Sequence, residues 1–211
     1  MKKSPLLLLS LTLNLGLASC SGEQETDSSG VNEITVGSSE QALAPLLEGI
    51  GDHHFEIFGD NEMSQRFFDQ GLTFAYAFNH QEAERAFREA ARLDPSCLIC
   101  QWGIALVLGP NFNAPMPEEN NDIAWQAISK GLDLLSTTTA KESDMLLALS
   151  SRYAYTHRGD RKELDEKYVD AMALLAETYP EDADILTLYA EAMMDLYPWA
   201  LYDNDATPAP H

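Results

Sequence analysis

The feature that most constrains the fold is the stretch of residues 65–95, which reads QRFFDQGLTFAYAFNHQEAERAFREAARLDP. Its apolar residues recur at spacings of three and four, the period of a helix with one buried face. This pattern predicts one helix over 61–77 and a second over 81–92, with Asn79 and His80 in the turn between them. The chain contains almost no alternating runs of β-branched residues, so the sequence predicts an all-α fold.

The same stretch resembles a tetratricopeptide repeat (TPR), a helix–turn–helix unit that stacks into solenoids. The residues on its signature positions are Phe67, Gly71, Phe74, Ala83, Phe87, Ala90 and Pro95. Gln70 departs from the pattern, because an apolar residue is usual there. The resemblance places Gly71 and Ala83 where the two helices cross, with Phe74 and Phe87 filling the space on either side.

Pro95 is expected to end this first unit and to lie in the first turn of the next helix, which Asp94 would cap. The second unit contains Ile104, Ala105 and Leu108 on signature positions. The loop GPNFNAPMP at 109–117 interrupts this unit, and a helix is predicted over 119–135.

Two weaker units follow. Thr139 and Glu142 form a capping-box pattern before an apolar run, and a helix is predicted from 162 to Pro180. The last unit has one helix, predicted over 181–197. The resemblance therefore implies a TPR-like solenoid of about three and a half repeats over 61–202.

Four strings strengthen this resemblance: HHFEIF, FFDQGLTFAYAFNH, FREAARLDPSCLICQWGIALVLGPNFNAPM and AEAMMDLYPW. They are similar to strings in a family of exported bacterial TPR proteins whose members are generally longer. The resemblance implies a fold and a scaffold role, and it implies no chemistry.

The first residues have the pattern of a secretory signal. Lys2 and Lys3 precede an apolar run from Leu6 to Leu17, which is too short to span a bilayer. The string LASC that follows resembles the lipobox of bacterial lipoproteins, and an ordinary signal peptide with a chance cysteine is the alternative. The resemblance implies cleavage before Cys20 and lipid attachment to its sulfur.

The predicted organisation follows from these patterns. Residues 1–19 are a signal peptide, 20–40 a flexible Ser-, Gly- and acid-rich tether, and 41–60 a segment before the repeats. The repeats occupy 61–202, and 203–211 form a tail. Ser21 follows the lipidated cysteine in place of Asp, which by resemblance favours the outer membrane of a Gram-negative cell.

The charge of the chain limits its partners. Lysine and arginine number 13 against 34 acidic residues, for a net charge of −21. Such a field repels nucleic acid and anionic lipid headgroups, whereas it permits basic protein partners.

Cys97 and Cys100 form a C-x-x-C pair that is predicted to lie in the first turn of the third helix. Haem attachment is rejected because Gln101 stands where histidine is needed. No metal site is predicted, because no histidine pairs with another cysteine at a recognisable spacing. A local disulfide in an oxidising compartment is favoured over a catalytic dithiol, since no βαβ pattern surrounds the pair.

The resemblance also implies an inner face that could bind a peptide. Its candidate groove residues are Gln65, Phe68, Leu72 and Tyr76, then Ile99, Trp102 and Leu106, with Thr187, Glu191 and Met194 in the last unit. The alternative is that Phe68 and Trp102 pack against residues 41–58. No catalytic residue and no cofactor is predicted.

The sequence thus predicts a lipid-anchored envelope scaffold that binds a protein or peptide partner. The alternative is a redox or metal-dependent envelope protein that uses Cys97 and Cys100. The helix over 181–197 has apolar residues on two sides and no partner helix after it. We therefore expect the chain to be part of a longer array, or to self-associate through this helix.

Overall fold

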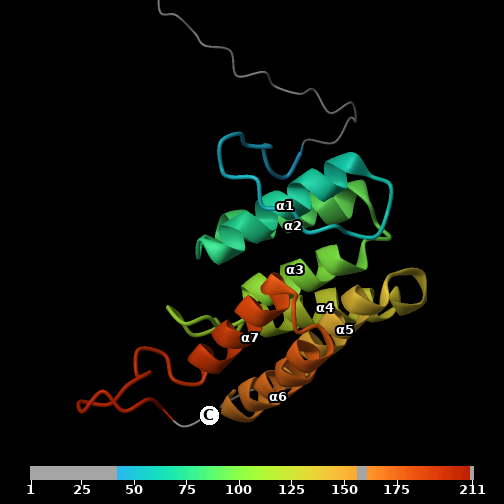
Figure 1. Ribbon diagram of the computed structural model, residues 1–211. Helices are drawn as coiled ribbons and strands as arrows, with labels where there is room; N and C mark the ends of the chain where they lie inside the picture. Colours follow the sequence, from blue (N-terminus) through green and yellow to red (C-terminus); the bar gives the residue numbers. More distant parts are fainter. Residues whose placement is uncertain (1–41, 156–160, 210–211) are drawn as a thin grey trace, which may run out of the picture. The chain divides into compact units, whose positions relative to one another are not determined.

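The computed structural model describes residues 42–155 and 161–209, all within the second of the chain's two units, Ser38–His211. In this part the fold is all-helical and contains no β-strand, which confirms the predicted fold class (Figure 1). The helices are α1 (Glu62–Tyr76), α2 (His80–Leu93), α3 (Leu98–Leu108), α4 (Asn120–Leu132), α5 (Ala140–Ser150), α6 (Lys162–Thr178) and α7 (Ala183–Asp195), with a 3₁₀ turn, η1 (Leu135–Thr137), between α4 and α5.

Helices that are neighbours in the sequence pack on one another throughout. α1 contacts α2, α2 contacts α3, and α3 contacts α4, while α5, α6 and α7 continue the series. α3 also packs against α5, which lies two helices further along the chain. The predicted helix over 119–135 is shorter than expected, because α4 ends at Leu132 and η1 follows.

The start of α3 differs from its prediction. The carboxylate of Asp94 accepts hydrogen bonds from the Ser96 backbone nitrogen at 2.9 Å and from Ser96 Oγ at 2.6 Å. It therefore folds the turn before the helix, and Pro95 lies in that turn. Cys97 is the residue that caps α3, because its Sγ accepts a hydrogen bond from the Cys100 nitrogen at 3.1 Å.

One of the two hydrogen bonds of the capping box predicted at the start of α5 is confirmed. Thr139 Oγ1 accepts a hydrogen bond from the Glu142 nitrogen at 3.2 Å. The return bond of a capping box is replaced, because the Glu142 carboxylate accepts from Thr138 Oγ1 and from the Phe58 nitrogen. Glu142 thereby ties the segment before α1 to α5.

The core is centred on the ring of Phe87, which is fully buried. A Cβ atom built on Gly71 of α1 would lie 2.6 Å from Phe87 Cδ1, and one built on Gly103 of α3 would lie equally close. α2 can therefore bring its aromatic ring against both neighbours only because each presents a glycine. Ala83 and Ala90 are also fully buried, whereas Phe74 is only partly buried against the core.

Several large apolar side chains remain exposed near the later helices. Leu174 on α6, Leu186 on α7 and Trp199 after α7 are 66%, 41% and 74% exposed. Trp199 contacts Phe112 of the 109–117 loop, with 5.2 Å between the ring centroids. The loop and the segment after α7 thus lie together.

Candidate binding site

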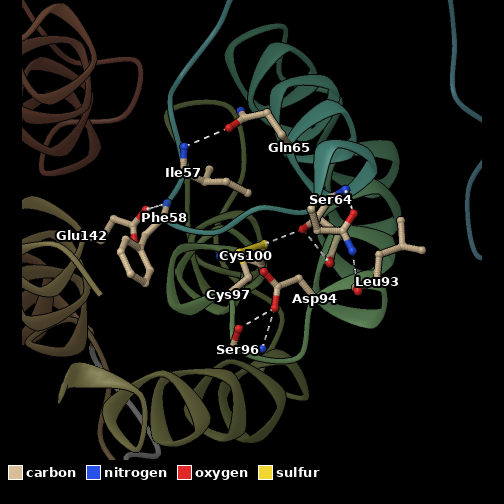
Figure 2. Close-up of a disulfide and its surroundings, with 12 residues drawn as sticks. Ile57, Phe58, Ser64, Gln65, Leu93, Asp94, Ser96, Cys97, Cys100 and Glu142 are labelled. Carbon is tan, nitrogen blue, oxygen red and sulfur yellow. Dashed lines mark hydrogen bonds between the residues drawn. A yellow bond between two sulfur atoms is a disulfide. The ribbon is translucent and has the colours of Figure 1, made fainter. Parts of the chain in front are cut away.

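A disulfide joins Cys97 and Cys100, whose Cα atoms lie 5.4 Å apart (Figure 2). Both residues are buried, and Ser64 Oγ of α1 lies 3.8 Å from Cys100 Sγ. A redox centre needs a sulfur that a partner can reach. The burial of this pair therefore favours the structural alternative over the catalytic one.

Residues 42–58 form an irregular segment, here called the strap, that covers much of α1. The side-chain amide of Gln65 binds its main chain twice: Oε1 accepts from the Ile57 nitrogen at 2.9 Å, and Nε2 donates to the Phe55 carbonyl at 2.8 Å. Asp69 Oδ1 accepts from the Phe55 nitrogen at 3.0 Å. Figure 2 shows Ile57 and Phe58 bound in this way by Gln65 and Glu142.

Apolar contacts hold the strap as well. The Phe55 ring packs against Phe68, with centroids 5.6 Å apart, and Lys141 Nζ lies 4.1 Å from the centre of the Phe55 ring. The groove residues Phe68, Leu72 and Trp102 are buried, so they are core residues and do not form an open groove floor. Packing of the strap on Phe68 is the arrangement that the sequence left as the alternative.

The presence of glutamine at position 70, where the repeat pattern usually has an apolar residue, has a physical explanation. Its side chain is buried, where Oε1 accepts from the Leu47 nitrogen at 2.8 Å and Nε2 donates to the Pro45 carbonyl at 2.9 Å. An apolar residue at this position would leave two main-chain groups of the strap without these partners. Gln70, which departs from the repeat pattern, is therefore one of the residues that bind the strap.

A small cavity of about 10 Å³, room for about one water molecule, lies where α1, α3 and α7 meet. We call it the Glu191 pocket, and its lining residues are Ala75, Tyr76, His80, Leu106, Val107, Pro110, Arg152, Leu188 and Glu191. Three of the predicted groove residues, Tyr76, Leu106 and Glu191, come together here. Tyr76 Oη donates to Asp184 Oδ1 at 2.6 Å, and His53 Nε2 of the strap lies 3.0 Å from the same oxygen.

A buried arginine forms one wall of the pocket. The Arg152 side chain is 3% exposed and makes two ion pairs, from Nε to Asp165 Oδ1 at 2.8 Å and from an Nη to Asp195 Oδ2 at 2.6 Å. The Tyr168 ring lies 4.9 Å from its guanidinium carbon. Burial alone would lower the pKa of Arg152, but the charges of Asp195 and Asp165 raise it above its usual value.

Glu191 has no such partner among the described residues. In the described part of the chain, its carboxylate makes no hydrogen bond and no ion pair. Burial, together with the charge of Asp195, raises the pKa of Glu191 to about 7, although Arg152 acts in the opposite direction. His80, also in the pocket, has a lowered pKa because it is buried, and its Nδ1 lies 3.2 Å from the Val107 carbonyl.

Sequence reasoning missed Arg152 and its two carboxylate partners. Arg152 was not singled out from the sequence, and it lies in the turn after α5. Its partners come from α6 and α7, 13 and 43 residues further along the chain. A basic residue next to an apolar run was the only signal in the sequence.

Neither a metal cluster nor a spanning helix is found in the described ranges. Histidine, cysteine, aspartate and glutamate side chains do not gather there in groups of three that could hold an ion. No helix among residues 42–155 and 161–209 is long and apolar enough to cross a membrane. Cys20 and the signal segment lie outside the described residues.

Comparison with known proteins adds no assignment. No model of a protein family, no curated protein and no solved structure matches the chain. The functional argument therefore depends on the pocket and the strap.

Proposed function

We propose that this protein is a scaffold of TPR-like repeats, anchored by lipid at Cys20 to a bacterial envelope membrane, that binds a segment of a partner protein. The successive packing of seven helices in the described part, with a Gly–Phe–Gly contact between the first three, supports a repeat architecture. In this architecture α1, α3, α5 and α7 are the first helices of four units.

One observation carries the binding role. α1 already binds a chain segment without regular secondary structure, because Gln65, Asp69 and Gln70 satisfy the main-chain groups of the strap. Main-chain recognition by helix side chains is what a peptide-binding face requires, since it tolerates different side chains in the bound segment. The Glu191 pocket next to Tyr76 has a volume of only about 10 Å³, so the partner is proposed to bind on the exposed surface of α7 around Thr187.

Site-specific photocrosslinking tests this proposal. Benzoylphenylalanine is placed at Thr187, one turn before Glu191 on α7, in the full chain expressed in its own cells. We expect a defined partner to be crosslinked at Thr187 and not at Glu166, an exposed residue of α6 that serves as the control. The same crosslinks from both positions, or none from either, would contradict a scaffold with this binding face.

The lipid anchor is tested separately. Cys20→Ser in the full precursor is expected to move the protein from the membrane fraction to the soluble fraction, because the sulfur that carries the lipid is lost. Unchanged membrane partition of the variant would remove the anchor from the proposal and leave the binding role intact.

A further inference from the structure

We infer that a cavity between α2, α3 and α4 binds a small organic anion, a carboxylate carried on a short apolar stem. The cavity, here called the α2–α4 cavity, is lined by residues of these three helices and by Leu43 of the strap. None of its lining residues belongs to α7, so the site is separate from the partner-binding surface around Thr187. The inference does not rest on the proposed function.

The size of the α2–α4 cavity suits a single small molecule. Its volume is about 250 Å³. An engineered protein cavity of about 150 Å³ is large enough to hold benzene, and sites for drug-sized ligands begin at about 300 Å³. A ligand slightly larger than benzene would therefore fill this space.

The charged residues of the cavity are all basic. Three of its ten lining residues are Arg88, Arg92 and Lys130, and none of the ten is acidic. This is unusual in a chain that has 13 basic and 34 acidic residues. The cavity is therefore a place where an anion is attracted at short range, even though the net charge of the chain repels it at long range.

The three cations differ in how far the chain itself engages them. Arg92 is held by Glu89, with Nε and Nη2 donating to the two carboxylate oxygens at 2.8 and 2.6 Å. Arg88 directs Nε and Nη2 at one oxygen, Glu84 Oε1, at 2.8 and 2.7 Å, so its Nη1 can still donate. Lys130 makes no ion pair with any residue that the structure describes. Donors for a ligand carboxylate thus remain on α2 and on α4.

Gln101 gives independent support. This residue of α3 lines the cavity and is only 9% exposed, yet its side-chain amide forms no hydrogen bond with the described residues. An enclosed amide without a partner is costly. A carboxylate oxygen that accepts from Gln101 Nε2 would reduce this cost and would fix the position of the ligand.

The other walls are apolar, which decides between kinds of anion. Ile104 and Ala127 are buried at the cavity, whereas Ile123 and Leu43 are 39% and 46% exposed. Apolar surface of this kind offers nothing to a compact inorganic anion such as phosphate. It does favour a ligand that carries an apolar stem behind its charged group. The expected ligand class is therefore an organic acid.

Helix periodicity places both kinds of group on the same faces. Ile123, Ala127 and Lys130 follow one another on α4 at spacings of four and three, so they share one side of the helix. Arg88 and Arg92 share a side of α2 for the same reason. Each of these two helices thus directs at least one cation toward the space between them.

The experiment uses the full chain at pH 7 with benzoate as the probe and benzamide, its neutral isostere, as the matched control. Isoleucine methyl groups are labelled with ¹³C, and the resonances of Ile104 and Ile123 are assigned with Ile104→Val and Ile123→Val. An aromatic ring bound in the cavity shifts these two methyl resonances. We expect saturable shifts with a dissociation constant of about 1 mM for benzoate, and binding of benzamide at least tenfold weaker.

Charge-removing variants locate the carboxylate. Arg88→Gln is expected to weaken benzoate about tenfold, and Lys130→Gln about threefold, because each removes a cation that faces the cavity. Lys167→Gln, at an exposed lysine of α6 outside the cavity, is the control and should leave the dissociation constant unchanged. Lys130 is itself exposed, so its variant tests the site without disturbing the core.

Three results would overturn the inference. The first is equal binding of benzoate and benzamide, and the second is an unchanged dissociation constant in both Arg88→Gln and Lys130→Gln. The third concerns the source of the carboxylate and uses an acetylated tripeptide that ends in phenylalanine with a free carboxylate. Tighter binding of this peptide than of benzoate would assign the cavity to the end of a polypeptide in place of a small organic acid.

Discussion

Two regions of this protein join three helices by opposite means. Around Phe87, α1, α2 and α3 meet through a ring between two glycines, and the contact is entirely apolar. Around Arg152, the turn after α5 meets α6 and α7 through one guanidinium and two carboxylates. The first region depends on shape, whereas the second depends on charges that must all be present together. Loss of one member should therefore have different consequences in the two regions.

The largest effect is expected from Arg152→Met. The substitution keeps an apolar stem but leaves Asp165 and Asp195 buried without a cation, and we expect a loss of about 3–5 kcal/mol in the free energy of unfolding at pH 7. Urea denaturation measures this loss. Lys167→Met, an exposed pair partner on α6, is the control and should change stability by less than about 0.5 kcal/mol. If both variants lost equally little, the Arg152 cluster would not be holding the later helices together.

Gly103→Ala tests the apolar region. Alanine is normally better than glycine in a helix by about 1 kcal/mol, but here its methyl group would lie 2.6 Å from the Phe87 ring. We expect a net loss of about 1–3 kcal/mol in urea denaturation. The double variant Gly103→Ala with Phe87→Leu should lose less than the sum of its two single variants, because they share one contact. Simple additivity would show that Phe87 and Gly103 are not coupled.

The disulfide should contribute an intermediate amount to the free energy of unfolding, because it closes a very short loop. Cys97→Ala with Cys100→Ala is expected to cost about 2 kcal/mol in thermal or urea unfolding. Cys97→Ser with Cys100→Ala should recover about 1 kcal/mol, since serine can accept the Cys100 backbone hydrogen bond that caps α3. Equal stability of the two double variants would mean that the sulfur cap contributes nothing.

The smallest effect is expected at His54, whose exposed pair with Asp69 is the surface counterpart of the Arg152 cluster. A hydrogen bond and the charge of Asp69 raise the pKa of His54, with Nδ1 2.8 Å from Asp69 Oδ2. A raised histidine pKa stabilises the fold below pH 6.5 and ceases to do so as pH rises through the folded-state pKa. His54→Gln should therefore cost under about 1 kcal/mol at pH 5.5 and nothing at pH 8.5. An equal loss at both pH values would show that charge is not involved.

The helices could be predicted from the sequence because their periodicity is local. The apolar spacing between residues 61 and 93 produced two helices within a few residues of their observed bounds. The start of α3 was misjudged, because Asp94 can either cap a helix or fold a turn, and Cys97 took the capping position. Only the first hydrogen bond of the predicted capping box at Thr139 forms, because the Glu142 carboxylate accepts a hydrogen bond from the Phe58 nitrogen instead of the Thr139 nitrogen.

What the sequence determined by itself is the all-helical class and the positions of most helices, since those depend on residues three and four apart. Only the tertiary structure decided that the strap covers Phe68, that Gln70 binds it, and that Arg152 finds partners on α6 and α7. These are directional contacts between segments far apart in the chain, and composition or period does not specify them. The enclosure of Glu191 beside Asp195 and Arg152 belongs to the same class, because an acidic residue on a helix can be identified as enclosed only once the helices around it are in place.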